Sequence, residues 1–383
     1  MGDARTAVAS DAGRRFVALD SLRGIAACGV LFMHIGPMGA IGTLPLIRHG
    51  DLFVDFFFVL SGFVIAAAYG ARIAEGFSRG TFMLLRFGRV YPLHIAVIAA
   101  FVAVKLASGR SLLEGEHGID YLARAVFLLE GYFHDANFYN GASWSIAVEV
   151  VAYAVAALLF GRGRLGTAVA AAIWLGSLTA YVAGFEWLVF TVFLQRCFIG
   201  FGLGCLAWWI HSRTAGLASR AASGLAEAGI LLACGSAIAV LGADGPSLLA
   251  CDLLFFVAVL VFARDRGVVS ALLATAPFQA LGRWSYSIYM TQMLVIRLGT
   301  GVLLVLLTWL GRDDLLLTAG QGGFSRIDFG MAGNTALSLA AAAACIALSA
   351  LTYRFIEQPG REWARRKARK RGAAGAEAVA PTI

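Results

Sequence analysis

The sequence predicts an all-α, polytopic transmembrane bundle of about ten helices with both termini in the cytoplasm. Hydrophobic residues make up 60% of the chain and charged residues 14%, whereas a soluble domain usually carries about 25% charged residues. The mean hydropathy is +0.78, and apolar runs long enough to cross a bilayer recur along the chain. A soluble enzyme is therefore excluded, and the net charge of +8 reflects membrane topology rather than nucleic-acid binding.

A transmembrane helix needs about 20 mostly apolar residues, and ten segments approach this length. They are residues 16–35, 52–69, 90–107, 144–160, 165–185, 188–210, 225–241, 248–263, 286–310 and 332–353. The seventh and eighth are short, and Glu227 stands at the start of the seventh. The first carries Asp20 and Arg23 and lacks a clear small-residue cleavage site, so we expect it to remain as a helix rather than be removed as a signal peptide.

The distribution of positive charge sets the orientation of these spans. With the N-terminus inside, 23 of the 31 lysines and arginines fall on the cytoplasmic side and six on the outer side. The chain then divides into a cytoplasmic N-terminal segment (1–15), a transmembrane domain (16–355) and a basic cytoplasmic tail (356–383), the end of which we expect to be disordered. We interpret the basic tail as a solvated stop-transfer segment that flanks the last span. Contact with anionic lipid is the alternative.

Two ionisable residues lie inside the first span, Arg23 in its inner half and His34 near its outer end. They are eleven residues apart, which is about three turns and about 16 Å of helix, so both fall on one face. Ionisable groups in hydrocarbon are costly and usually mark a pathway or a site. The spacing predicts a polar track toward His34, whose neutral imidazole would suit a general base. A histidine that only bonds a neighbouring helix is the alternative.

The outer end of the fourth span carries a second polar group. Ser143 is expected to cap the helix, and Ser145 and Glu149, four residues apart, share a face. Glu149 lies at a depth comparable to that of His34, and a carboxylate that orients an imidazole is a common way to activate a base. The alternative is an ion pair with Arg196 that holds this helix to its neighbours.

The second span carries a further carboxylate. Asp55 lies about one turn inside the apolar run, where it faces either the same cavity as His34 or the helix end, which it would cap. In the same span, Ser61-Gly62 predicts a close helix contact rather than a catalytic serine.

The inner ends of the third and ninth spans carry basic and aromatic residues. Arg86 and Arg89 are three apart and form one basic patch, and guanidinium groups bind phosphates through paired hydrogen bonds. Anchoring by positive charge is the alternative. Pro92 is expected at the start of its helix. Tyr286 and Tyr289 share a face and, taken alone, indicate an aromatic belt at the membrane surface.

No metal site is expected from the sequence. The histidines other than His34 are scattered without ligand spacing. The six cysteines stand in apolar stretches, without zinc-finger spacing or a loop context suited to a disulfide. We therefore interpret the cysteines as small buried hydrophobic residues.

Six segments in order along the chain resemble the acyltransferase family 3 of integral membrane proteins. They are Arg23-x10-His34, Asp55-Phe-Phe-Phe-Val-Leu-Ser-Gly-Phe63, Arg86-x-x-Arg89-x-x-Pro92, Ser143-Trp-Ser-x-x-x-Glu149, Ser285-Tyr-x-Ile-Tyr289 and Tyr353-Arg-Phe-Ile-Glu-Gln-Pro359. The resemblance covers nearly the whole chain, and the first segment is the family's first-helix signature. Gln292 is a departure, since members often carry a histidine there. Glutamine cannot titrate, which argues against a second proton-transfer role on the ninth helix.

The resemblance implies transfer of an acyl group, usually acetyl, from cytoplasmic acyl-CoA to a hydroxyl, often of a cell-envelope or exported carbohydrate, at the bacterial inner membrane. On this basis His34 is the expected general base, oriented by Glu149 or Asp55. The residues expected at the acyl-CoA site are Arg23, Arg86, Arg89, Tyr286 and Tyr289. Those expected at the substrate or the oxyanion are Ser145, Trp144, Asn140 and Gln292.

Two other classes of protein remain as alternatives. A transporter would pass an acyl or lipid-linked group along the same polar track without chemistry, although the chain shows no internal repeat of the kind found in many transporters. A purely structural membrane protein would leave the charges inside the spans unexplained. Dependence on acyl-CoA, with release of free CoA, separates the enzyme from both.

Overall fold

The computed structural model describes residues 15–36, 39–109, 111, 118–132, 139–214, 220–241, 245–312, 315–317 and 326–371. Nearly all regular structure in these ranges is helical, and the predicted all-α fold is confirmed. The exception is an antiparallel pair of two-residue strands, β1 (Leu316–Leu317) and β2 (Arg326–Ile327). The expected cytoplasmic N-terminal segment before residue 15 and the expected disordered end after residue 371 lie outside the described residues.

Among the described residues, ten apolar helical stretches correspond to the ten predicted spans. Eight are long enough to cross a membrane: α2 (Val17–Ile35), Gly50–Ala74, α7 (Arg79–Ala107), α10 (Gly163–Val182), α11 (Val192–His211), α12 (Arg220–Leu241), α15 (Ala276–Trp309) and Gly330–Lys370. Two are shorter, α9 (Ser143–Leu159) and α13 (Gly245–Phe262). The chain is therefore a multi-pass integral membrane protein.

Several elements are composite or short. The stretch Gly50–Ala74 joins η1 (Gly50–Leu52), α5 (Phe53–Ile65), η2 (Ala66–Gly70) and α6 (Ala71–Ala74). The stretch Gly330–Lys370 joins α16 (Gly330–Thr352), η5 (Tyr353–Glu357) and α17 (Gln358–Lys370). The short elements are α3 (Gly39–Gly42), α4 (Pro45–Arg48), α8 (Ile119–Val126), η3 (Glu130–Tyr132) and α14 (Val268–Leu273).

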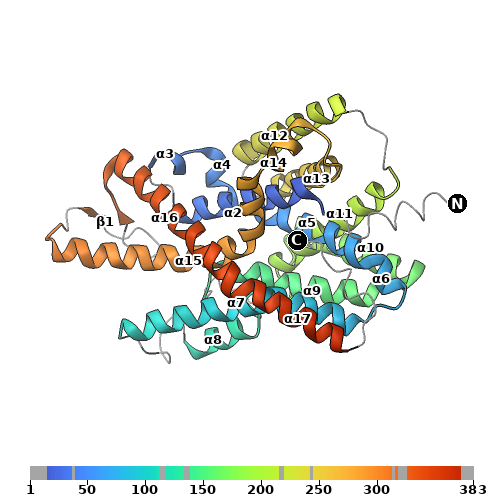
Figure 1. Ribbon diagram of the computed structural model, residues 1–383, viewed down its shortest axis with the longest axis horizontal. Helices are drawn as coiled ribbons and strands as arrows, with labels where there is room; N and C mark the ends of the chain where they lie inside the picture. The colour runs from blue at the N-terminus through green and yellow to red at the C-terminus, as the bar shows by residue number, and fades with distance from the viewer. Residues whose placement is uncertain are drawn as a thin grey trace.

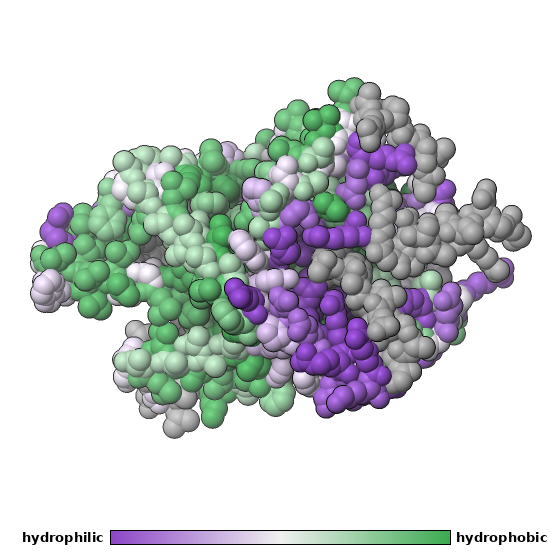
Figure 2. Space-filling view, viewed as in Figure 1, coloured by the Kyte–Doolittle hydropathy of each residue, from purple (hydrophilic) through white to green (hydrophobic). Residues whose placement is uncertain are grey.

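One end of the bundle is marked by polar side chains. Figure 2 shows hydrophilic residues gathered over α17 and the beginning of α7, whereas the opposite part of this face is mainly hydrophobic. We call this the basic end and define it by α17 and by Arg79 at the start of α7. The beginning of α2 and the end of α17 both lie toward the basic end (Figure 1). An even number of spans requires this, because the chain then enters and leaves the bundle on the same side.

Glycines allow the helices around the centre of the bundle to approach closely. A Cβ atom on Gly24 of α2 would lie 2.5 Å from the carbonyl carbon of Leu281 on α15. A Cβ atom on Gly62 of α5 would overlap the carbonyl oxygen of Phe201 on α11. The predicted helix contact at Ser61-Gly62 is confirmed, and it seats α5 against α11 beside the cavity described below.

The start of the third span differs from its prediction. α7 begins at Arg79, where the Ser78 hydroxyl accepts a hydrogen bond from the Thr81 amide at 3.3 Å. Pro92 therefore lies inside the helix rather than at its start. Because proline lacks an N–H group, the helix loses one internal hydrogen bond there. Gly360 packs close to Pro92, so α17 covers this weak point.

The basic tail is a docked helix over most of its described length. Ala364 and Ala368 of α17 are fully buried, and α17 packs along α7. The prediction of a solvated flank is therefore wrong for this face of residues 358–370. The opposite face keeps the expected character, because Arg366 and Lys370 are exposed there.

Candidate active site

A cavity of about 740 Å³, part of it open to solvent, lies among α2, α5, α7, α9 and α15. Along α5 its wall runs from Val54 to Ile65, which is about 16 Å of helix. The cavity is therefore an elongated passage along the bundle.

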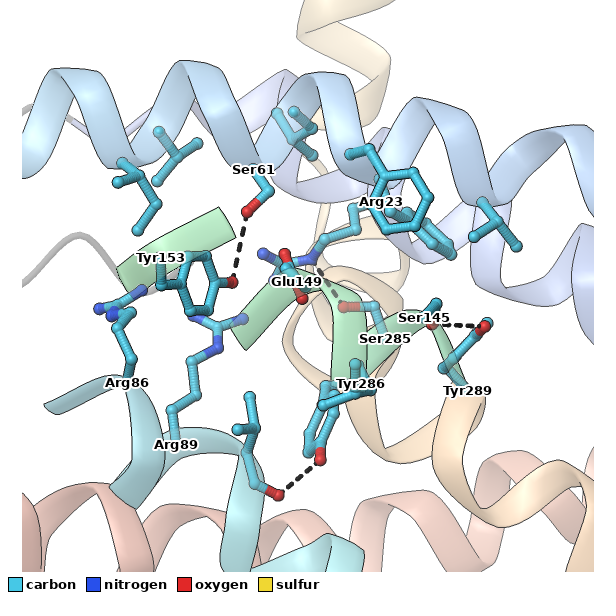
Figure 3. A pocket seen from close by; sticks show the side chains of 18 residues that line it. Arg23, Ser61, Arg86, Arg89, Ser145, Glu149, Tyr153, Ser285, Tyr286 and Tyr289 are labelled. Carbon is cyan, nitrogen blue, oxygen red and sulfur yellow. Dashed lines mark hydrogen bonds between the residues drawn. The ribbon is translucent and has the colours of Figure 1, made fainter. Parts of the chain in front are cut away.

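All five residues predicted to bind acyl-CoA line this cavity, and Figure 3 shows them converging from three helices. They are Arg23 from α2, Arg86 and Arg89 from α7, and Tyr286 and Tyr289 from α15. Of the lining residues, Glu149 is the one that carries a carboxylate. Three guanidinium groups against one carboxylate give the cavity wall an excess of positive charge, which favours an anionic ligand.

The two α7 arginines keep donor capacity for such a ligand. The Arg86 Nη2 atom donates to the Tyr69 hydroxyl at 3.0 Å, while its buried Nε has no partner among the described residues. Figure 3 shows the Arg89 guanidinium beside Tyr153, and it interacts electrostatically with the buried carboxylate of Glu357. Unused guanidinium N–H groups are suited to phosphate oxygens.

Arg23 is fixed in the cavity wall by α15. Its Nε donates to the Ser285 hydroxyl at 2.8 Å and its Nη2 to the Gly282 carbonyl at 3.1 Å. The Asp20 carboxylate lies 3.9 Å from the same Nη2. The conformation of Arg23 is thus set before any ligand enters, which lowers the entropic cost of binding.

The two tyrosines are part of the interior. Tyr286 and Tyr289 are 9% and 5% exposed, so the interpretation as a surface aromatic belt is wrong. Tyr286 donates to the Val90 carbonyl at 2.5 Å. The Tyr289 and Ser145 hydroxyls are 2.8 Å apart, and the ring of Phe57 packs edge-on against Tyr289 with centroids 5.7 Å apart. Ser145 and Tyr289 line the cavity at the end away from Arg86 (Figure 3), with Phe57 packed against Tyr289.

Glu149 faces the cavity rather than the first-helix histidine. It lies close to the Tyr153 hydroxyl and interacts electrostatically with Arg23 and Arg86. The expected pairing of Glu149 with His34 is therefore not formed. Its carboxylate instead partly balances the charge of the arginines when the cavity holds no anion.

Asp55 and Arg196 form a buried ion pair between α5 and α11. The two Asp55 oxygens accept from Arg196 Nε at 3.1 Å and Nη2 at 2.6 Å, and Asp55 is fully buried. This paired geometry is the strong form of an arginine–carboxylate contact. Neither predicted position of Asp55, beside His34 or at a helix cap, is observed. Arg196 also lies over the ring of Trp144, 5.6 Å from its centroid. Trp144 packs against Phe193 and does not line the cavity.

His34 is half-buried and does not line the cavity; it lies about 16 Å along α2 from Arg23. Its Nδ1 is 3.1 Å from the Val30 carbonyl oxygen. Since a carbonyl only accepts, Nδ1 carries the proton, and the neutral ring presents Nε2 as its basic atom. The carboxylate that interacts electrostatically with His34 is Asp51. Sequence reasoning missed Asp51, although its place just before the second span puts it at the membrane level of His34.

The comparisons with known proteins decide the family. A family model described as an acyltransferase domain (acyltransferase family 3) matches residues 16–354. The chain belongs to this family. Acyl transfer is therefore its class of reaction.

Two relatives match parts of the chain. Protein 2 in the picA locus of Rhizobium radiobacter is 33% identical over 167 residues, which cover 39% of this chain and 85% of that protein. The acyltransferase MdmB of Streptomyces mycarofaciens is 29% identical over 149 residues, 36% of this chain and 38% of that protein. No solved structure matches the chain.

In this acyltransferase a buried network joins the start of α9 to its surroundings. Asn140 donates to the Met290 carbonyl at 3.1 Å. The helix begins at Ser143, with Ala142 at the N-cap, so the predicted Ser143 cap is wrong. The Ser143 hydroxyl donates to the Glu130 carboxylate instead. Burial raises the pKa of Glu130 to about 7. Asn140 thus supports the cavity wall from behind rather than lining it.

Gln292 completes the set of predicted site residues. It stands one turn beyond Tyr289 on α15, is fully buried, and lies close to the His34 imidazole. Neither its Nε2 nor its Oε1 completes a hydrogen bond within the described ranges. As for metals, no group of three or more His, Cys, Asp or Glu side chains gathers as ligands in the described part of the chain.

Proposed function

We propose that this protein is a membrane O-acyltransferase that moves an acyl group, acetyl above all, from cytoplasmic acyl-CoA to a hydroxyl of a cell-envelope or exported carbohydrate at the bacterial inner membrane. The observation that carries the proposal is the cavity, in which three arginines and one carboxylate line a passage of about 740 Å³. Arg86 and Arg89 stand within the first eleven residues of α7, near the basic end. The positive-inside rule puts that end in the cytoplasm, where acyl-CoA is found.

The donor site follows the length of the cavity. Arg86 and Arg89, with Arg23 in the opposite wall, would bind the phosphates of acyl-CoA through charge-assisted hydrogen bonds. The narrow pantetheine arm would lie along α5, whose lining residues extend for about 16 Å. The thioester would then reach the end lined by Ser145 and Tyr289, on the side of His34.

His34 would act as the general base from that end. Its Nε2 takes the proton of the acceptor hydroxyl while the hydroxyl oxygen attacks the thioester carbonyl carbon. The new C–O bond forms, the C–S bond breaks, and the proton passes from His34 to the leaving thiolate. General-base catalysis of this kind contributes about 10²–10⁴-fold. The imidazolium form of His34 exists between these two proton transfers. The neighbouring carboxylate of Asp51 would stabilise it.

A covalent acyl-His34 intermediate is the alternative route. In that route the His34 Nε2 attacks the thioester first and the acceptor hydroxyl then displaces the acyl group. Incubation with labelled acetyl-CoA in the absence of acceptor distinguishes the two. Label retained on the wild-type protein, and lost in His34→Ala, supports the covalent route.

The test of the function uses purified protein in lipid nanodiscs with labelled acetyl-CoA and extracted envelope glycans. Wild type is expected to transfer label to glycan and to release free CoA, which a transporter would not do. His34→Ala should lower kcat by about 10²–10⁴-fold with unchanged membrane insertion. Turnover at the wild-type rate in His34→Ala would refute the scheme.

The donor site is tested by binding. Arg89→Ala should weaken acetyl-CoA binding by about tenfold or more, since a charge-assisted hydrogen bond contributes about 1.5–3 kcal/mol. Arg366→Ala is the matched control, because Arg366 is exposed on α17 at the same end of the protein and does not line the cavity. Equal acetyl-CoA affinity of the Arg89 and Arg366 variants would remove the phosphate-binding role.

A further inference from the structure

The hydrogen bonds of the described residues do not explain why the polar side chain of Gln292 is buried. It is fully shielded from solvent, yet the carboxamide nitrogen and oxygen are both left without a hydrogen bond in the described part of the chain. Buried polar groups in native proteins are nearly always paired, and each exception calls for an explanation. An amide with both its donor and its acceptor unused is suited to a ligand that arrives later.

The position of Gln292 places that ligand at the reacting atoms. Gln292 follows Tyr289 by three residues on α15, which is about one turn, or about 4.5 Å along the axis, on nearly the same face. Tyr289 lines the cavity. Gln292 itself lies beside the imidazole of His34, whose Nδ1 is already bonded to Val30. Gln292 therefore lies one turn beyond a residue of the cavity wall and next to the basic imidazole.

This turn of α15 is held firmly in place. The Met290 carbonyl accepts a hydrogen bond from Asn140 at 3.1 Å. The Thr291 hydroxyl bonds the Ser287 carbonyl at 2.8 Å and the Ser349 hydroxyl at 3.1 Å. A donor on a rigid element is preorganised, which is what stabilisation of a developing charge requires.

Ser145 is the other residue that the sequence analysis proposed for the oxyanion. Its hydroxyl already has hydrogen-bond partners. Its hydroxyl is 2.8 Å from the Tyr289 hydroxyl and 3.3 Å from the Ala142 carbonyl oxygen. Neither amide atom of Gln292 completes a hydrogen bond with good geometry in the described part of the chain, and its polar neighbour is the His34 imidazole. The structure thus separates two residues that the sequence alone left equivalent.

We propose that Gln292 is a catalytic residue whose Nε2–H donates a hydrogen bond to the thioester carbonyl oxygen; the assignment rests on the acyl transfer proposed above. When the acceptor oxygen attacks the thioester carbonyl carbon, one electron pair of the C=O bond moves onto the carbonyl oxygen. The Gln292 Nε2–H group binds the oxyanion that forms there. The pair returns as the C–S bond breaks and the thiolate takes the proton from His34. Because an amide does not titrate, the donor is present at every working pH.

The test compares Gln292→Met with Gln292→His and Ser338→Ala in nanodiscs. Methionine has a similar length but no donor, so kcat should fall by about 10²–10³-fold, the loss seen when one oxyanion donor is removed. Histidine retains an N–H donor, so kcat of Gln292→His should be at least tenfold higher than kcat of Gln292→Met. Ser338→Ala removes a buried hydroxyl from α16, away from the cavity wall, and should keep kcat within threefold. The acetyl-CoA dissociation constant should stay within about threefold in all three, which shows that each variant is folded.

The pH profile separates this role from an indirect one. If Gln292 binds the oxyanion, the acid limb of kcat/KM should have the same midpoint in Gln292→Met as in wild type, with the whole curve lowered. A shifted midpoint with full activity on the plateau would show that Gln292 acts through His34, and would overturn the proposal. Wild-type kcat in Gln292→Met would overturn this proposal alone. Absence of transfer by the wild type from any acyl-CoA would overturn the proposed function and this proposal with it.

Discussion

The buried carboxyl of Glu130 makes the stability of the protein depend on pH. Glu130 is 4% exposed, and its carboxylate accepts hydrogen bonds from the Tyr139 amide at 2.8 Å and from the Ser143 hydroxyl. Burial outweighs these hydrogen bonds and raises the pKa from 4.5 to about 7. The folded protein therefore holds a proton on Glu130 at pH values where the unfolded chain has released it.

The sign and size of the effect follow from this difference. Between pH 4.5 and about 7 the folded state binds more protons, so the free energy of unfolding falls as the pH rises. One pKa unit corresponds to about 1.4 kcal/mol, and the difference of about 2.5 units gives a loss of about 3 kcal/mol across this window. The stabilisation is complete below pH 4.5 and is lost as the pH passes 7.

The measurement is the free energy of unfolding in mixed micelles from pH 4 to 8, followed by tryptophan fluorescence. Glu130→Gln stays neutral throughout, so it should lack this slope and gain up to about 3 kcal/mol relative to wild type between pH 4.5 and 7.5. Glu362→Gln, at an exposed position on α17, should retain the wild-type slope. Parallel curves for wild type and Glu130→Gln would refute the reasoning.

Further predictions concern packing and buried charge, with unfolding in micelles as the common measurement. Gly62→Ala should lose about 1–3 kcal/mol, because its methyl group would overlap a carbonyl oxygen of α11. Gly176→Ala meets open space and should gain up to about 1 kcal/mol; equal effects at the two positions would contradict the packing. Arg196→Met should lose about 3–5 kcal/mol, since it leaves the buried Asp55 charge uncompensated. Asp252→Asn should keep or raise stability, because neither Asp252 oxygen has a hydrogen-bond partner in the described part of the chain. A marked loss there would reveal an attractive partner for the charged form.

Local features of the sequence were sufficient for the spans and for the donor side of the site. Hydropathy is a property of each segment by itself, and all ten predicted segments coincide with apolar helices. A charge in hydrocarbon is costly enough that it must face a cavity or a partner. The spacing of Arg86 and Arg89 predicted one basic patch, and the resemblance to the acyltransferase family placed Arg23 with them; all three line the cavity.

The pairing of charges across helices could not be predicted in the same way. Glu149 and Asp55 each stand on a helix face that could meet several neighbours, and helical periodicity does not say which neighbour packs there. The close approach of α5 to α11 at Gly62 decides that Arg196 meets Asp55 and leaves Glu149 to the cavity. The boundary of α7 was missed because its first turns carry arginines, which lower the hydropathy of a segment that is nonetheless helical.

The contact among Ser145, Tyr289 and Phe57 also bears on how the membrane remains a barrier. A water-filled path from the basic end to His34 would let protons and ions leak down the membrane potential. At the end of the cavity away from Arg86, two hydroxyls are bonded to each other and an aromatic ring packs against them. We therefore expect the protein without ligand to pass no ions, and an acyl chain that moved past these side chains would have to displace them.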